Sequence, residues 1–136
     1  MRNAIISLLL LLSSLFLFTG CGCSKKNAAK EETDVEVNTN EEVIKDQEVD
    51  GLKLTNTSLT KTDGIWTLVT EVSNNTGSDY ELNEFTILIK DSEGNVLVTL
   101  PGYVGGTIPN GESRTINSST DADLENAASV EYSVDK

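Results

Sequence analysis

The chain has 136 residues, of which 22 are acidic and 10 are basic, and its net charge is −12. This length fits one domain but not two. The acidic balance argues against nucleic acid as a partner, because binding it needs clustered Lys and Arg side chains that face phosphate. The sequence has no histidine, so the commonest general base and metal ligand are missing. We therefore expect a protein that is not an enzyme and has no cofactor.

The N-terminal stretch has the proportions of a secretory signal peptide. Arg2 provides a positive start, and residues 4–18 form an apolar run without a charge. At about 15 residues, this run is shorter than the roughly 20 that a membrane-spanning helix needs. We therefore predict a cleaved signal peptide over residues 1–20.

A cysteine follows this apolar run. Phe18, Thr19, Gly20 and Cys21 resemble the lipobox of bacterial lipoproteins, with Phe18 where the family usually has leucine. The resemblance implies cleavage between Gly20 and Cys21 and a diacylglyceryl group on the Cys21 thiol, which would anchor the protein to the outer face of the bacterial cell membrane. Cys23 is the alternative attachment site, but it lacks an apolar residue at lipobox spacing. A strained disulfide between Cys21 and Cys23 is the third alternative.

Residues 21–50 are predicted to be the anchored cysteine followed by a disordered acidic linker. From residue 24 to residue 49 the chain has eight acids and no aromatic residue, so it offers little apolar surface to bury. Two local patterns compete with this interpretation. Residues 33–37 alternate like a strand, and residues 40–45 fit one helical turn capped by Asn40. Both are too short to persist alone.

Residues 51–136 show the period-two alternation of half-buried strands. Strands are predicted at 52–60 with a bulge after residue 55, and at 65–73, 80–91 (one strand or a pair of strands), 96–100, 114–118 and 130–134. Turns are predicted at 61–64, 92–95 and 108–113, and a bend or a switch between sheets at 101–107. Residues 121–128 are predicted to form a short helical turn capped by Thr120 or Asp121. About seven short strands at this spacing favour an all-β fold, a small Ig-like antiparallel β-sandwich.

The inward face of the central strand is the clearest part of this pattern. Trp66, Leu68, Thr70 and Val72 share one face of residues 65–73, and Trp66 is the only tryptophan in the chain. We predict that Trp66 belongs to the core. The alternative is an exposed aromatic platform on which a ligand stacks.

The order of several turns supports a resemblance to a known domain. Residues 72–77, 87–96 and 108–113 resemble the FxLYD-type domain of bacterial surface proteins, with a strand that ends in Asn, a hairpin of the form Asp-x-x-Gly and a turn of the form apolar-Pro-Gly-Glu. Ile87 and Lys90 replace the Phe and Tyr that name the motif, and Asn110 is inserted in the last turn. The resemblance covers residues 51–134 and implies a sandwich in an extracytoplasmic setting, without catalytic residues.

Two acidic clusters raise the question of calcium. One comprises Asp91 and Glu93, and the other comprises Asp121, Asp123 and Glu125. Neither has the loop spacing of a dedicated calcium site, and turn chemistry or helix capping explains both. We therefore predict no metal site.

The sequence as a whole favours a lipid-anchored, non-catalytic binding or accessory module. Its partners would be the membrane, through the diacylglyceryl cysteine, and a protein or another component of the cell envelope, with exposed sheet edges as docking surfaces. The alternatives are a structural spacer or envelope-sensing domain without a stable partner and, less favoured, a small hydrolase that uses carboxylates.

Overall fold

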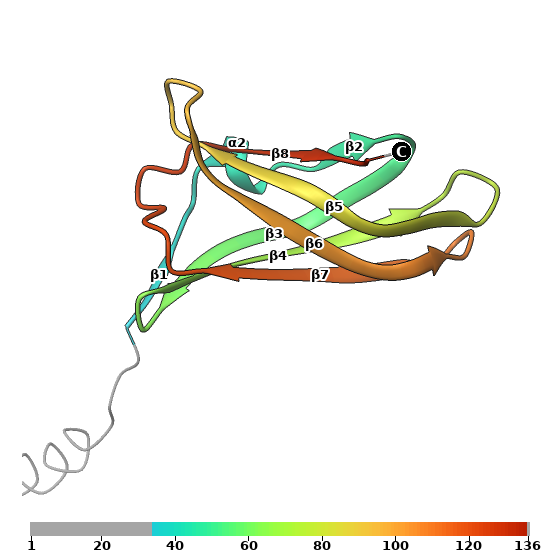
Figure 1. Ribbon diagram of the computed structural model, residues 1–136, viewed down its shortest axis with the longest axis horizontal. Helices are drawn as coiled ribbons and strands as arrows, with labels where there is room; N and C mark the ends of the chain where they lie inside the picture. The colour runs from blue at the N-terminus through green and yellow to red at the C-terminus, as the bar shows by residue number, and fades with distance from the viewer. Residues whose placement is uncertain (1–33, 136) are drawn as a thin grey trace, which may run out of the picture. The chain divides into compact units, whose positions relative to one another are not determined.

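The computed structural model describes residues 34–135 of the chain, and its fold is a sandwich of two antiparallel β-sheets (Figure 1). The described part contains eight strands and one short helix: β1 (Val35–Val37), α2 (Glu41–Ile44), β2 (Gln47–Val49), β3 (Leu52–Thr62), β4 (Ile65–Asn74), β5 (Tyr80–Lys90), β6 (Val96–Ile108), β7 (Ser113–Thr120) and β8 (Ser129–Ser133). The predicted all-β antiparallel sandwich is confirmed, with eight strands where about seven were expected.

The two sheets divide the strands unequally. Sheet A has the order β1-β3-β4-β7, and β2 also pairs with β3, whereas sheet B has the order β6-β5-β8. The hairpin between β3 and β4 turns at Asp63 and Gly64, which both have positive φ, as two-residue hairpins require. The predicted bulge in β3 lies between Thr55 and Ser58, where the register with β4 shifts.

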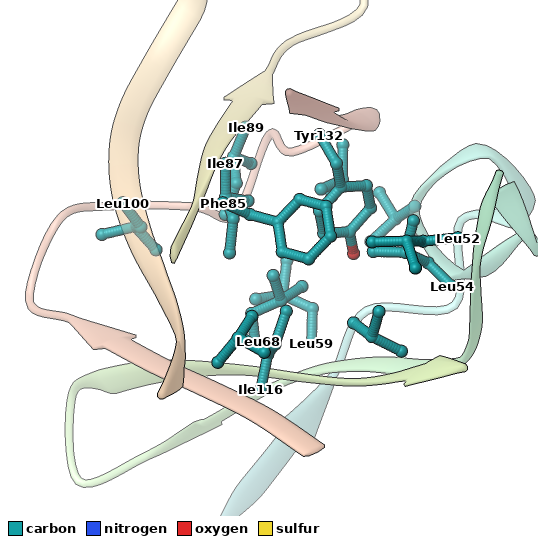
Figure 2. Packing of buried hydrophobic residues seen from close by; sticks show 14 of the residues in the cluster. Leu52, Leu54, Leu59, Leu68, Phe85, Ile87, Ile89, Leu100, Ile116 and Tyr132 are labelled. Carbon is teal, nitrogen blue, oxygen red and sulfur yellow. The ribbon is translucent and has the colours of Figure 1, made fainter. Parts of the chain in front are cut away.

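The core lies between the sheets and is built by strict alternation along the strands. Trp66, Leu68, Thr70 and Val72 of β4 all point inward and are buried. Phe85, Ile87 and Ile89 of β5 meet them from sheet B, and the rings of Phe85 and Tyr132 pack edge to face at 6.4 Å (Figure 2). Trp66 is only 4% exposed, so it is a core residue, and the alternative of an exposed stacking platform is wrong.

Two threonine side chains form a buried polar cluster beside the β3 bulge. The hydroxyls of Thr57 and Thr70 lie 2.8 Å apart, and Thr70 also donates to the carbonyl of Thr55. Burial raises the pKa of the nearby Tyr132, and the two threonine hydroxyls act more weakly in the opposite direction. The bond from Thr70 satisfies the backbone carbonyl of Thr55 next to the bulge, and the two hydroxyls satisfy each other, so we assign these contacts a structural role.

The predicted disordered linker over residues 21–50 is wrong for its second half. Residues 34–50 form β1, α2 and β2, and both strands pair with the outer edge of β3. Asn40 caps α2 as its sequence suggested, and the Val43 side chain is fully buried. These elements are too short to be stable alone, but β3 provides a hydrogen-bonding template and the core covers Val43. The folded domain therefore begins by residue 34 and not at residue 51.

One further prediction is wrong, and for another segment one of two predicted alternatives is confirmed. Residues 121–128 form turns and not a helix, although Thr120 does accept a hydrogen bond from the backbone of Ala122. Of the two alternatives for residues 101–107, the bend is confirmed and the switch between sheets is wrong, because β6 stays paired with β5 along its length and bends at a bulge near Gly105 and Gly106. A bulge lets one long strand follow the curvature of the sandwich without leaving its partner.

Candidate functional site

The residues predicted to carry the lipid anchor cannot be placed in the fold. Phe18, Thr19, Gly20 and Cys21 lie outside the described residues, as does Cys23. Within residues 34–135, no helix is long and apolar enough to cross a membrane. The anchor therefore remains a prediction from the sequence.

The acidic clusters have structural roles in the fold. Asp91 accepts hydrogen bonds from the backbone amides of Glu93 and Asn95 and from the Asn95 side chain, which closes the β5–β6 hairpin. The bond from the Asn95 side chain makes the largest contribution to lowering the pKa of Asp91. Asp123 accepts from the backbone of Glu125 in the turns before β8. No group of three or more potential metal ligands gathers within the part of the chain that the structure describes.

The edges of the sheets are the remaining candidate docking surfaces, and two of them are covered. At the β8 edge, the Gln47 side chain donates to the carbonyl of Val130 at 2.7 Å. At the β6 edge, Ser118 donates to the carbonyl of Pro101 at 2.7 Å. The N–H and C=O of one strand residue point the same way, so the missing N–H of Pro101 falls on this same edge. An added strand would find these positions occupied or without a donor.

Strand β1 differs because none of residues 34–135 covers its outer edge. The amide of Asn38 donates to Leu59 at 2.9 Å, next to the register pair of Val37 and Thr60. Bonding directions alternate along an antiparallel strand, so the N–H and C=O groups of Glu36 point toward β3, whereas those of Val35 and Val37 point away from it. Within residues 34–135, no hydrogen bond reaches these outward-pointing groups.

The surface beside this edge is uncharged. The register places ten neighbouring side chains on the outer face of sheet A, which we call the β1 face: Val35, Val37, Ser58, Thr60, Thr62, Ile65, Thr67, Val69, Asn117 and Ser119. Six large apolar residues of the described part are substantially exposed, and three of them lie here, with Val35 at 50%, Val37 at 58% and Ile65 at 42%. Half of the substantially exposed large apolar side chains of residues 34–135 therefore lie on this one uncharged face, which makes it a candidate contact surface.

The opposite side of β1 is charged. Lys61 of β3 lies opposite Glu36 and forms ion pairs with Glu36 at 3.2 Å and with Glu125 at 3.0 Å. Its ammonium also lies 5.6 Å from the centre of the Trp66 ring. The hydrogen bond from Lys61 to Glu125, and to a smaller extent the one to Glu36, raise the pKa of the lysine. Two carboxylates thus share one ammonium, which leaves an excess of negative charge beside β1.

These charged groups border an open depression of about 500 Å³. Its lining residues come from β1, the segment before α2, β4 and the turns before β8: Glu36, Val37, Asn38, Thr39, Asn40, Trp66, Glu125 and Ala127. Glu36 and Trp66 point away from the β1 face, so the depression lies mainly on the other side of the open edge, and Val37 borders both surfaces. Together, the edge, the β1 face and the depression form the candidate site.

Comparison with known proteins adds no second line of evidence, since no family model, curated protein or solved structure matches this chain. The lipobox and FxLYD resemblances consequently stay predictions. The β1 edge is not evident from the sequence, because Val35, Glu36 and Val37 fall in a segment whose composition predicts a linker. The one signal for it in the sequence is the alternation of residues 33–37, which is too short to predict a strand without the pairing to β3.

Proposed function

We propose that this protein is an extracytoplasmic, lipid-anchored binding module without catalytic activity, and that it recognises a protein or another envelope component. The diacylglyceryl group on Cys21 would tether it to the outer face of the cell membrane. The observation that carries the binding role is the open edge of β1. Open edges with exposed apolar side chains are the surfaces at which sandwiches accept an added strand.

The binding role is tested by blocking the edge without disturbing the sheet. In the Val37→Pro variant, the outward N–H is lost, whereas the bonds between β1 and β3 made by Glu36 and Asn38 stay in place. Thr99→Pro is the matched control, because Thr99 lies two residues from Pro101 on the β6 edge and its N–H also points outward.

The measurement is co-purification from a detergent-solubilised membrane fraction with the full chain as bait. We expect partners recovered with the wild-type chain and with Thr99→Pro to be lost with Val37→Pro, while all three unfold at similar urea concentrations. Recovery that is the same for both proline variants would contradict a role for the β1 edge.

The anchor has its own test. We expect the Cys21→Ala variant to lose lipid labelling and to leave the membrane fraction, whereas Cys23→Ala keeps both properties. Labelling that persists in the Cys21→Ala variant but disappears in Cys23→Ala would move the attachment site to Cys23.

A further inference from the structure

We infer that the β1 edge selects an extended protein segment in which apolar and basic residues alternate. This inference rests on the proposed function and specifies its partner. It follows from the difference between the two sides of β1, one of which is uncharged and the other acidic.

The pairing geometry fixes which partner residue meets which side. In an added antiparallel strand, the residue opposite Glu36 points its side chain to the same side as Glu36. The residues opposite Val35 and Val37 point toward the β1 face. A partner strand therefore presents every second side chain to carboxylates and the intervening ones to apolar surface.

The acidic side favours a basic residue at the position opposite Glu36. The side chains of Glu36 and Glu125 are both more than half exposed, and Lys61 is the one ammonium that they share. Asp34, two residues before Glu36, is a further exposed acidic residue next to β1. A Lys or Arg side chain of the partner fits beside Glu36 in the 500 Å³ depression, where it balances the excess negative charge.

The β1 face favours apolar or β-branched residues at the two flanking positions. Val35 and Val37 are half exposed, and Thr62 and Thr60 stand beside them in the register. A charged side chain there would meet no opposite charge among the members of this face. Apolar cross-strand pairs on such a surface contribute roughly 0.2–1 kcal/mol each, and the face offers two of them.

A second copy of this chain is a poor occupant of the edge. Antiparallel pairing of two β1 strands with Val35 opposite Val37 would place Glu36 opposite Glu36, and like charges in that position are destabilising. Each copy also contributes a net charge of −12. The charge pattern thus selects a basic partner and disfavours self-association.

The test compares two labelled peptides, Val-Lys-Val-Lys-Val and Val-Glu-Val-Glu-Val, for binding to the full chain in detergent by fluorescence anisotropy. We expect the lysine peptide to bind at least about tenfold more tightly. Val37→Pro should abolish its binding, and Glu36→Gln should weaken it several-fold. Glu131→Gln is the matched control, since Glu131 is an exposed carboxylate on β8 paired with Lys90, and it should have no effect.

Each other outcome overturns the inference. If the Val37→Pro variant still bound the lysine peptide, that binding would reflect general electrostatic attraction to an acidic protein and not pairing with the β1 edge. The two peptides could bind equally, or neither could bind, while partner recovery still depends on Val37. The β1 edge would then keep its proposed binding function, but the preference for alternating apolar and basic residues would be refuted. Dimerisation of the chain that Val37→Pro abolishes, measured by analytical ultracentrifugation, would make a second copy the occupant. Partner recovery unaffected by Val37→Pro would contradict the proposed function itself.

Discussion

Replacing Val43 with alanine should destabilise the domain by about 2 kcal/mol. The side chain is fully buried, and the substitution removes two methyl groups at about 0.8 kcal/mol each, to which a cavity term is added. For a domain of about 100 residues, this corresponds to a fall of about 10 °C in the melting temperature. The prediction is specific to the fold, because Val43 would cost nothing if residues 24–49 were a disordered linker.

Trp66 makes the assay direct. It is the only tryptophan in the chain and is buried in the core, so its fluorescence reports unfolding in urea. Val37→Ala is the matched control: the same substitution at a half-exposed residue should cost less than about 1 kcal/mol. If Val43→Ala and Val37→Ala had the same small effect, residues 34–50 would not pack on the sandwich, and our account of the N-terminal segment would be refuted.

Three further predictions concern the sandwich itself. Gly102→Ala should cost about 1–3 kcal/mol in urea unfolding, because the new Cβ would lie 2.9 Å from Ile87 Cδ1; an unchanged midpoint would contradict this close approach. Asn74→Ala should cost about 3 kcal/mol in the same assay, since its buried side chain donates to two backbone carbonyls, and a cost below about 1 kcal/mol would contradict that role. Desolvation and the hydrogen bond to Asp50 raise the pKa of Tyr80 to about 12. The stability that protonated Tyr80 contributes is therefore present below pH 10 and is lost as the pH rises through about 12. In a titration followed by tyrosinate absorbance, Asp50→Asn should lower the pKa of Tyr80, and an unchanged pKa would contradict the hydrogen bond.

The strands that the sequence predicted best are those whose burial repeats every second residue. In β4, four alternating residues from Trp66 to Val72 point into the core, and the pattern of side chains alone reveals such a strand. The turns at Gly64 and Gly94 could be predicted equally well from the sequence. Both residues have positive φ, which glycine adopts without strain.

The N-terminal segment could not be predicted in the same way. Its strands have three residues each, and neither Val35 nor Val37 is buried, so its order comes from the ladder with β3 and from the single buried residue Val43. Contacts of that kind are set by tertiary structure and leave little periodicity in the sequence. The candidate site was missed for the same reason, since its open edge exists only because β1 pairs with β3 on one side.

Amide hydrogen exchange of the full chain, read residue by residue by NMR, tests the β1 edge most directly. The N–H groups of Val35 and Val37 point outward, whereas that of Glu36 points toward β3. Our account predicts that the lysine peptide slows exchange at Val35 and Val37 strongly and at Glu36 much less. Protection that appears instead along β6 or β8, with Val35 and Val37 unchanged, would contradict it.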